Sequence, residues 1–318
     1  MMRVLALVPG GIGDQLLFFP TLASLKGKYP QATIDVVVEP RSVGAYRLTT
    51  LVDKVWEFDF KDRNSLADWG NLLGNVREQE YAAVMSLGKS WAVGFFLWLT
   101  GIPKRIAFAD GSNFWLTDPI PLKTEQYAAE MYHDLLQGFG IKAPCPPIKI
   151  QVPQSDLEWA EAEQQRLGIK ESGYILLHGG SSELAVKKGI AKIYPPQQWA
   201  AVLQQVRERV NLPIVVLQGP EDGEFVSKLQ NLVEVKVTSP SDLGKTAGMV
   251  AAANLLLCTD SAPMHLGVAV GTALVALFGP TDPKKLLPPL AKYKFVQSGT
   301  GNIADIDPQT IVECVLGT

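Results

Sequence analysis

The chain alternates between short apolar runs and longer segments in which apolar residues recur at helical spacing, with polar or glycine-containing turns between them. Short runs without polar alternation are typical of strands buried on both faces of a parallel sheet. The alternation therefore predicts an α/β fold built from strand–helix–strand units. Strands are expected over residues 3–8, 32–38, 55–58, 82–87, 106–108, 174–177, 213–217, 233–238, 254–258, 273–278 and 294–297. Helices are expected over residues 14–29, 66–77, 90–99, 125–138, 156–167, 241–253, 262–270 and 307–315.

A proline-rich stretch divides this pattern into two halves. The sequence KAPCPP is followed by Val152 and Pro153, and the alternation restarts afterwards. Prolines cluster in this way in connections between domains. We place the linker near residues 144–153 and the domains at residues 1–148 and 149–318. A chain of 318 residues is long enough for two domains with separate cores.

The sequence SWAVGFFLWL, over residues 90–99, is apolar on every face of the expected helix. A helix of this kind is normally buried, and the run is far too short to span a bilayer. We therefore expect a buried helix. If its aromatic side chains were exposed instead, they would offer a surface for an acceptor or a membrane. The residues concerned are Trp91, Phe95, Phe96 and Trp98.

Composition narrows the function classes. The formal charge is −3, from 29 Lys and Arg against 32 Asp and Glu, so no general attraction to nucleic acid is expected. Cys145, Cys258 and Cys314 lie far apart and lack metal-ligand spacing, and Cys258 ends an expected buried strand, which fits a reduced core thiol. Residues 1–9 have the pattern of a first strand rather than of a signal peptide. We therefore expect a cytoplasmic protein.

The segment over residues 249–283 has the order strand, polar turn, helix, strand. Its turn carries Asp260 and Ser261, and His265 follows in the expected helix. In an open parallel sheet, ligands bind beyond the carboxyl ends of the strands, where the N-terminus of a helix offers N–H groups to anions. The alternative is that Asp260 and Ser261 only cap the helix. The residues alone leave both interpretations open.

Two parts of this segment, DSAPMHL and GTALVALFGPT, resemble the donor-site signature of glycosyltransferase family 9, the heptosyltransferase-like enzymes. The resemblance implies that a nucleotide-sugar donor binds here. Family members usually have glycine where this chain has Ala262, a change expected to alter slightly how closely the backbone approaches a phosphate. The implied donor-binding residues are Asp260, Ser261, Ala262 and His265.

A glycine loop follows the first strand, and Asp14 comes after Gly11 and Gly13. This order invites a dinucleotide-binding interpretation, but Leu16 occupies the position of the third glycine, and Glu39 then has no claim to be the ribose-binding acid. The sequence GGIGDQLLFFP instead resembles the N-terminal motif of family 9. That resemblance implies that Asp14 is the catalytic base and that Gly11 and Gly13 lie near it. The alternative is that Asp14 is an ordinary helix cap.

A second polar turn, HGGSS, ends the first strand of the C-terminal half. Its Ser181 and Ser182 stand where family members have small hydroxyl residues near the phosphates. The sequence KIYPPQQW resembles the family segment in which a lysine precedes a proline and a tryptophan, which implies that Lys192 meets the diphosphate. A point cation suits such a group. The loop is longer than in the family, so Lys187 and Lys188 stay open as alternatives to Lys192.

Glu221 is the candidate for contact with the ribose. The expected strand over residues 213–217 is followed by QGPED, and an acid at such a strand end can accept hydrogen bonds from ribose hydroxyls. Family members carry a comparable Gly-x-Glu. The alternative is that Glu221 is only a turn residue ahead of a helix.

The resemblance covers nearly the whole chain and implies the glycosyltransferase B fold, in which two Rossmann-like domains face a cleft. It implies inverting transfer of a sugar, with a heptose as one option, from a nucleotide-diphosphate sugar, with ADP as the favoured nucleotide, to a glycan or lipid-linked acceptor. Asp14 would take the proton of the acceptor, while Lys192 and the helix N–H groups after Ser261 would stabilise the leaving diphosphate. The chain has no carboxylate cluster at ligand spacing, so we expect catalysis without a metal or a cofactor. His133 and Glu130 are interpreted as a surface pair.

Two other function classes stay open on the residues. One is a sugar-nucleotide epimerase or hydrolase of the same fold, which would form product without any acceptor. The other is a non-catalytic protein that binds a nucleotide sugar and consumes no acceptor. A peripheral contact with the inner face of the membrane is also left open.

Overall fold

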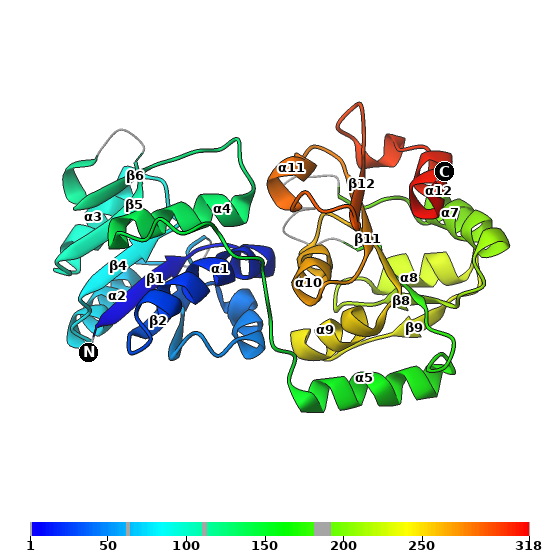
Figure 1. Ribbon diagram of the computed structural model, residues 1–318, viewed down its shortest axis with the longest axis horizontal. Coiled ribbons are helices and arrows are strands. Elements are labelled where there is room, and N and C mark those ends of the chain that lie inside the picture. The colour runs from blue at the N-terminus through cyan, green and yellow to red at the C-terminus, as the bar shows by residue number, and fades with distance from the viewer. Residues whose placement is uncertain (1, 62–63, 110–112, 181–191, 318) are drawn as a thin grey trace. The chain divides into compact units, whose positions relative to one another are not determined.

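The computed structural model describes residues 2–61, 64–109, 113–180 and 192–317. Over these residues the chain forms two compact units, Met1–Gln151 and Val152–Thr318, whose boundary falls inside the stretch predicted to be the linker. Figure 1 shows that each unit is one sheet covered by helices. We refer to them as unit 1 and unit 2.

Unit 1 is built on a six-stranded parallel sheet with the order β3-β2-β1-β4-β5-β6. Its strands are β1 (Arg3–Val8), β2 (Thr33–Val38), β3 (Lys54–Glu57), β4 (Ala83–Ser86), β5 (Lys104–Ala109) and β6 (Asp118–Pro121). Its α-helices are α1 (Ile12–Lys28), α2 (Leu66–Glu78), α3 (Trp91–Leu99) and α4 (Ala128–His133), and its 3₁₀ segments are η1 (Pro40–Leu48), η2 (Asn113–Trp115) and η3 (Asp134–Phe139). The central strands are mostly apolar, as expected for a sheet covered on both faces: α2 and α3 pack on one face, and α1 packs with η1 and α4. The exceptions include Asp35, which is buried in β2 and paired with Arg3.

Unit 2 repeats the same plan with the order β12-β11-β10-β7-β8-β9, again all parallel. Its strands are β7 (Ile175–His178), β8 (Ile214–Leu217), β9 (Lys236–Thr238), β10 (Leu255–Thr259), β11 (Leu274–Phe278) and β12 (Tyr293–Gln297). Its helical segments are α5 (Gln154–Leu167), α7 (Pro196–Arg209), α8 (Gly223–Gln230), α9 (Leu243–Ala252), α10 (Ala262–Val270), α11 (Pro283–Leu286), η4 (Ile303–Asp305) and α12 (Pro308–Leu316).

The strand order locates the ligand-binding edge of each sheet. In unit 1 the order runs outward in both directions from β1 and β4, and in unit 2 from β7 and β10. Ligands of doubly wound sheets bind beyond the carboxyl ends of the strands at this switch point. The glycine loop with Asp14 directly follows β1, and the Asp260–Ser261 turn directly follows β10. Both candidate sites therefore lie at a switch point.

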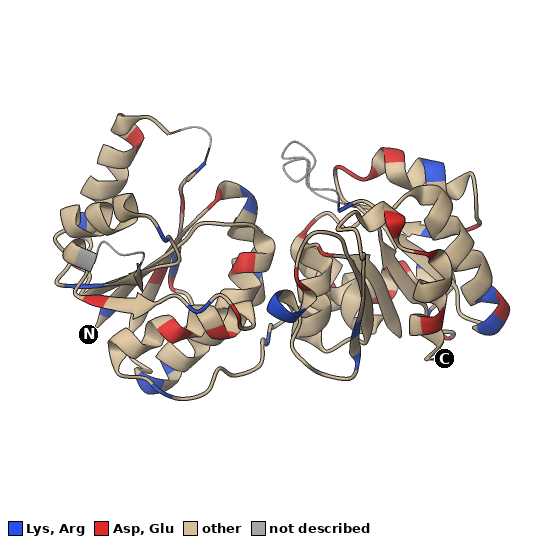
Figure 2. Cartoon of the chain, turned by 90° about the horizontal axis from the view of Figure 1, so that it is seen from above, with Lys and Arg blue, Asp and Glu red and all other residues tan. Residues whose placement is uncertain are grey.

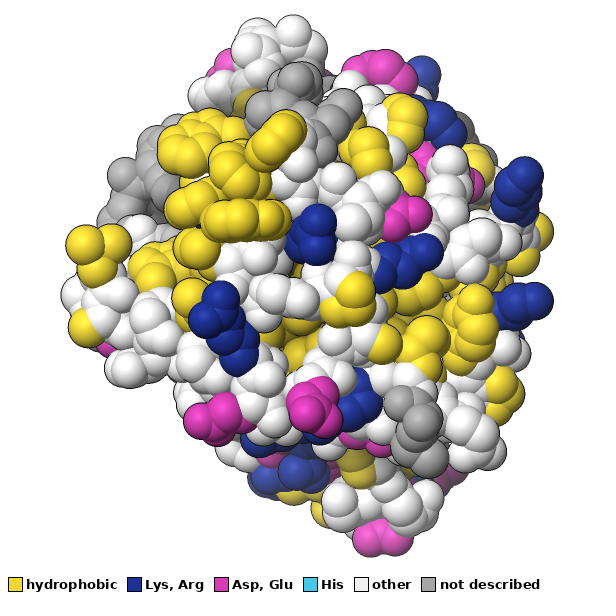
Figure 3. Space-filling view, turned by 90° about the vertical axis from the view of Figure 1, so that its left-hand side faces the viewer, with side chains coloured by type: hydrophobic (Ala, Val, Ile, Leu, Met, Phe, Trp, Pro, Cys, Tyr) yellow, Lys and Arg dark blue, Asp and Glu magenta, His cyan; other side chains and the backbone are white. Residues whose placement is uncertain are grey.

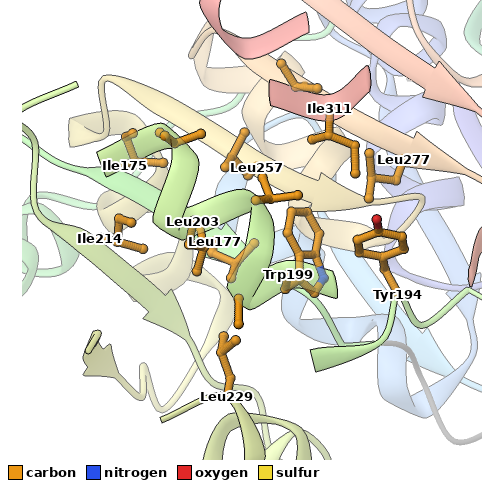
Figure 4. Packing of buried hydrophobic residues seen from close by; sticks show 14 of the residues in the cluster. Ile175, Leu177, Tyr194, Trp199, Leu203, Ile214, Leu229, Leu257, Leu277 and Ile311 are labelled. Atoms are coloured by element: carbon orange, nitrogen blue, oxygen red, sulfur yellow. The ribbon is translucent and has the colours of Figure 1, made fainter. Parts of the chain in front are cut away.

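The core of unit 2 fixes the start of α7. Trp199 is fully buried against Tyr194, with the two ring centroids 5.2 Å apart and nearly perpendicular. The Tyr194 hydroxyl donates to the carbonyl of Ile306 at 2.8 Å. Figure 4 shows both rings packed among apolar side chains of the sheet, α7 and α12. Because Lys192 lies two residues before Tyr194, this packing anchors the backbone next to the lysine.

Several local predictions differ from the structure. The single helix expected over residues 125–138 is α4 followed by the tighter η3, where Gly138 lies so close to Ile106 that a Cβ would meet it at 2.8 Å. Strand β6 was not predicted, because Pro119 and Pro121 argue against a strand, but an edge strand tolerates them. His133 is buried and bonds to a serine, so its interpretation as a surface residue is wrong.

Helix α3 is the clearest correction. Phe96 and Leu97 are buried as predicted, but Trp91 is 62% exposed and Trp98 is 47% exposed. The prediction of a buried helix is therefore wrong for one of its faces. The pattern could not show this, because the residues that face solvent are as apolar as those that face the core. Figure 3 shows hydrophobic side chains gathered on this side of unit 1. Among the described residues, no helix is long and apolar enough to cross a membrane.

Candidate active site

The turn after β10 meets the end of β7 at the switch point of unit 2. The two strands pair in parallel, and Cys258 stands opposite His178 in their register. Cys258 is fully buried with a free thiol, as predicted. The residues that follow it leave the sheet beside His178, which is the last residue of β7. Polar side chains from two strand ends are therefore brought together at one edge.

Asp260 is the centre of the first group of contacts. Its carboxylate is 6% exposed and accepts hydrogen bonds from Lys192 Nζ at 2.5 Å and from Thr281 Oγ1 at 2.7 Å. Its backbone N–H donates to the carbonyl of Leu277 at 3.1 Å. Asp260 thus ties together the ends of β10 and β11 and the segment ahead of α7. The interpretation of Asp260 as a helix cap is wrong, because its carboxylate bonds to Lys192 and Thr281. The predicted contact of Lys192 with the diphosphate stays a prediction.

Ser261 occupies the N-cap position of α10, but within the described chain its hydroxyl caps no N–H of that helix. It lies 3.2 Å from His178 Nδ1 and 3.2 Å from the carbonyl oxygen of Thr259, to which it donates. Helix α10 begins at Ala262, which carries the first backbone N–H of the helix. The next residue, Pro263, has no N–H, and the N–H of Met264 donates to the carbonyl of Ser261 at 3.1 Å. A helix start of this kind can bind an anion through the N–H of Ala262. The role of Ala262 in binding the donor stays a prediction.

Asp222 and His178 are functional candidates that the sequence did not identify. His178 Nε2 lies 3.4 Å from Asp222 Oδ2, which also accepts the backbone N–H of Gly219 at 2.7 Å. Burial opposes the charge on Asp222, but the bonds from His178 and Gly219 outweigh it and hold the pKa of Asp222 below its ordinary value. Glycine is required at position 180, where a Cβ would lie 1.7 Å from Asp222 Oδ1.

The remaining donor-side predictions fall into three cases. Glu221, which the sequence favoured, is exposed, whereas its neighbour Asp222 points inward. His265 is 5% exposed within α10, so it belongs to the interior of the helix start. The other predicted residues lie outside the described residues: Ser181, Ser182, Lys187 and Lys188.

Both oxygens of the Asp14 carboxylate are held in unit 1. Oδ2 accepts the backbone N–H of Gly11 at 2.8 Å, and Oδ1 accepts the hydroxyl of Tyr132 at 2.8 Å. Gly10, at φ +147°, leaves room for this carboxylate, since a Cβ there would lie 2.3 Å from Oδ2. Burial, with the charge of Asp14 beside it, raises the pKa of Tyr132 well above its ordinary value, so the phenol stays a donor. Asp14 does bond to the helix start, and this contact does not exclude a role as base.

Polar side chains of α1 and η1 hold the glycine loop in place. Gln15 in α1 donates to the carbonyl of Val8 at 3.0 Å and accepts the Tyr46 hydroxyl at 2.7 Å, while Ser42 donates to the carbonyl of Gly10 at 2.8 Å. Gly13, the other predicted loop residue, lies in the first turn of α1. Tyr132, which sequence reasoning missed, comes from α4 and had no signal of its own.

A metal ion would need a cluster of ligand side chains. Within the described part of the chain, no group of three or more His, Cys, Asp or Glu side chains could hold a metal ion. Metal independence stays a prediction.

The family model of glycosyltransferase family 9 (heptosyltransferase) matches residues 69–316. The chain belongs to this family. Lipopolysaccharide heptosyltransferase 3 from Escherichia coli is 24% identical over 289 residues, which cover 85% of this chain and 81% of the relative. The photosynthetic NDH subunit of subcomplex B 1, chloroplastic, from Arabidopsis thaliana is 23% identical over 337 residues, which cover 97% of this chain and 72% of that protein.

The fold is that of known family members. The solved structure of the E. coli ADP-heptose lipopolysaccharide heptosyltransferase II matches with a TM-score of 0.80 at 20% identity, covering 99% of this chain and 98% of that chain. Two parallel six-stranded sheets with helices confirm the predicted glycosyltransferase B fold. With the family, the activity class is glycosyl transfer.

Proposed function

We propose that this family 9 glycosyltransferase transfers a heptose from ADP-heptose to a lipopolysaccharide-type acceptor. The names of two similar proteins, a lipopolysaccharide heptosyltransferase and an ADP-heptose lipopolysaccharide heptosyltransferase, support this donor and this acceptor class. The observation that carries the proposal is the contact of Lys192 with the Asp260 turn at the switch point of unit 2. It gives a doubly charged leaving group a cation and a helix start within one domain.

On the donor side, the leaving diphosphate is stabilised by Lys192 and by the N–H of Ala262. An ammonium group has three donor hydrogens, and Asp260 uses one of them, so Lys192 keeps donors for phosphate oxygens. Asp260 and Thr281 hold the lysine in place rather than contact the phosphates. As the bond from the anomeric carbon to the phosphate oxygen breaks, the growing negative charge on ADP meets this fixed positive group.

On the acceptor side, Asp14 is the general base. It takes the proton of an acceptor hydroxyl while that oxygen forms the new bond to the anomeric carbon, and the configuration at that carbon inverts. Gly11 and Tyr132 each donate one hydrogen bond to the carboxylate, which fixes its orientation and leaves a lone pair for the acceptor. Glu221 remains the candidate for contact with the ribose, whereas His265, buried within α10, would support the start of this helix.

Another similar protein is named as a subunit of a photosynthetic NDH subcomplex and not as a transferase, which motivates a second candidate, a non-catalytic protein that binds a nucleotide sugar. The two candidates separate in one assay. The protein is incubated with ADP-heptose and a heptose-deficient lipopolysaccharide core, and both ADP release and the mass of the acceptor are followed. Matched release and glycosylation support the transferase. Donor binding without either product supports the binding protein, and ADP release without an acceptor would support the hydrolase class instead.

The same assay tests metal independence. Turnover should persist after exhaustive chelation, because Lys192 and a helix start supply the positive charge that a metal would otherwise supply. The control is the addition of magnesium or manganese to the chelated protein. A collapse of turnover that only one of these ions restores would contradict the account of the diphosphate given above.

We also propose that unit 1 contacts an anionic lipid surface through α3 and η2. Their contiguous rings form what we call the aromatic surface, in which neighbouring centroids lie between 5.0 and 5.9 Å apart. It consists of Phe95, Trp98, Phe114 and Trp115. Trp91, which is 62% exposed, lies one turn before Phe95 in α3 and extends the exposed apolar face of this helix. Tryptophan favours the interface between headgroups and acyl chains because its ring is apolar and its N–H is polar.

Charges of both signs are interspersed over both units (Figure 2). Beside the aromatic surface, however, there are cations that could attract an anionic partner. Arg77 donates to the carbonyl of Leu99 at 3.0 Å and Arg105 to that of Trp115 at 2.8 Å, so both cations are held at the border of α3 and η2. Lys89, which is exposed, lies two residues before α3. Cations beside interfacial aromatic residues add attraction to anionic lipids.

Vesicle binding tests this contact. Trp91→Ser combined with Trp98→Ser should strongly reduce co-sedimentation with vesicles that contain phosphatidylglycerol, and binding should weaken at high salt. Phe295→Ser is the matched control, because Phe295 is 43% exposed but belongs to unit 2. Equal binding of the double variant and the control would contradict the proposal, as would a dimer of the wild type that the double variant abolishes.

A further inference from the structure

Three side chains, from the ends of β7 and β10 and from the start of α8, form one chain of polar contacts in unit 2. Asp222, after β8, contacts His178 at the end of β7, and His178 contacts Ser261 at the end of β10, with distances of 3.4 and 3.2 Å. Asp222 and His178 are 6% and 8% exposed. The chain leads from a buried carboxylate to a hydroxyl at the start of α10, next to the N–H of Ala262. Neither helix capping nor the ion pair of Lys192 accounts for it.

The protonation state of His178 decides which way the Ser261 hydroxyl donates. In the neutral ring, the Asp222 carboxylate favours the tautomer with its proton on Nε2, so Nδ1 is an acceptor. Ser261 then donates to Nδ1 or to the carbonyl of Thr259 and turns its lone pairs outward. In the protonated ring, Nδ1–H donates to Ser261, and the hydroxyl hydrogen is free to point toward an anion at the helix start.

We propose that His178 is a positioning residue for the donor diphosphate and that donor binding is accompanied by uptake of one proton at this histidine. This inference rests on the donor site proposed above. A diphosphate at the start of α10 favours the protonated ring for two reasons. The reoriented Ser261 hydroxyl can donate a hydrogen bond to a phosphate oxygen, and the positive charge of the ring attracts the negative charge of the diphosphate. Asp222 stabilises that charge. The proton comes from the solvent and leaves again with the nucleotide.

The charges around His178 determine whether donor affinity rises or falls with pH. The charged or titratable groups described at the neighbouring strand ends and helix starts are Asp222, Glu221, Cys258, Asp260, Lys192 and His265. Helix α8 adds Glu224 and Lys228, which pair with each other. Lys192 and Asp260 neutralise each other, which leaves the Asp222 carboxylate as the charge in direct contact with the ring. Because the donor prefers the protonated form, its affinity is highest at low pH. Its Kd should rise with pH, by at most tenfold per pH unit, across the range in which histidine titrates.

Calorimetry with ADP-heptose tests the proton uptake directly, because its bridging diphosphate has no group that titrates near neutral pH. Titrations at one pH in two buffers of different ionisation enthalpy should give heats that differ by the uptake of nearly one proton. His178→Gln should abolish the difference. It should also weaken binding by roughly tenfold at about pH 6, the effect of one lost hydrogen bond to a charged group, and much less at about pH 8.

Two further variants separate positioning from a structural role. Asp222→Asn keeps an acceptor for the N–H of Gly219 but removes the charge, so the pH dependence of Kd should move to lower pH. His133→Gln is the matched control, because His133 makes a similar contact with Ser24, at 2.8 Å, in unit 1. It should leave the proton uptake unchanged. A wild-type chain that binds ADP-heptose with equal heats in both buffers overturns the inference.

A spectroscopic measurement covers the case in which a variant does not fold. The chain has three histidines, so the ring signals of the wild-type protein can be resolved by NMR. Addition of ADP-heptose should convert one ring to the doubly protonated form, and a ring that stays neutral on binding contradicts the proposal. Absence of ADP-heptose binding at every pH would instead refute the proposed donor, which keeps the two failures distinct.

Discussion

The ion pair of Lys192 and Asp260 balances the charge of the donor site before a ligand arrives. The two side chains lie 2.5 Å apart, and the carboxylate is almost fully buried while the ammonium group keeps some contact with solvent. Removal of one partner from such a pair is costly because it leaves the other charge buried and unpaired. Lys192 therefore has a structural role in this pair, which can be separated from its proposed role in binding.

Lys192→Ala should weaken donor binding by about 1.5–3 kcal/mol, the range for a hydrogen bond to a charged group. Calorimetry with ADP-heptose measures this loss, and thermal unfolding should show a lower melting temperature because Asp260 loses its cation. Adding Asp260→Asn should restore part of the stability but not the affinity. A larger loss of affinity in Lys187→Ala or Lys188→Ala would transfer the role to one of those lysines.

Asp14→Asn should lower turnover by about 10²–10⁴-fold, the usual contribution of a general base, with little change in donor affinity. The amide keeps the shape of the side chain and can still accept the N–H of Gly11, so helix α1 should be unaffected. Initial rates with saturating ADP-heptose measure the effect. Turnover close to that of the wild type would show that another group takes the proton.

The sequence named a candidate residue where that residue stands in a recognisable motif. It could not name a residue that is brought to the site only by a contact with a distant part of the chain. Asp14, Lys192 and Asp260 were named from their motifs, and the last two prove to be in contact. Tyr132 could not be named, because 118 positions separate it from Asp14 and only the packing of α4 on α1 joins them. Asp222 was missed in favour of Glu221, because sequence alone does not say which of two adjacent acids turns inward.

At the scale of elements, burial decides which predictions succeed. Helix α10 has the bounds that were predicted, since Pro263 and Gly271, at φ +84°, mark its two ends in the sequence. Helix α3 was placed correctly but given the wrong environment, because its exposed face is as apolar as its buried one. Periodicity identifies a helix by the contrast between its faces, and α3 has none.

The turn after β7 gives a prediction at this scale. Gly180→Ala should destabilise unit 2 by about 1–3 kcal/mol, because its Cβ would overlap Asp222 Oδ1 and push that carboxylate away from His178. Gly74→Ala is the matched control: nothing lies within 4 Å of its added Cβ in α2, where alanine should stabilise the helix by about 0.5–1 kcal/mol. Denaturant unfolding measures both. Equal stability of the Gly180 variant and the wild type would mean that Asp222 moves at no cost.

At the scale of the whole molecule, the chain uses one topology twice. Both sheets have the same outward order from a central pair of strands, although their residues differ. The alternation of strands and helices predicted this α/β class, whereas the pairing order could not be derived from it, because pairing depends on contacts between distant segments. The topology also explains why each unit presents its candidate residues at the carboxyl ends of β1, β7 and β10.

The identity of the nucleotide is best tested on the intact chain, because no single residue so far assigned contacts a base. A ligand that binds only the folded state stabilises it by about 2.7 kcal/mol at a hundred times its Kd. For a unit the size of Val152–Thr318 this should raise the melting temperature by about 5–10 °C.

We expect such a shift with ADP, smaller shifts with UDP, GDP, CDP and TDP, and none with NAD. The proposed diphosphate contacts at Lys192 and Ala262 are the same for all five nucleotides, so the differences among their shifts report on the nucleoside. A preference for UDP or GDP would retain glycosyl transfer and overturn the ADP-linked donor, whereas stabilisation by NAD alone would contradict the whole account of the unit 2 site.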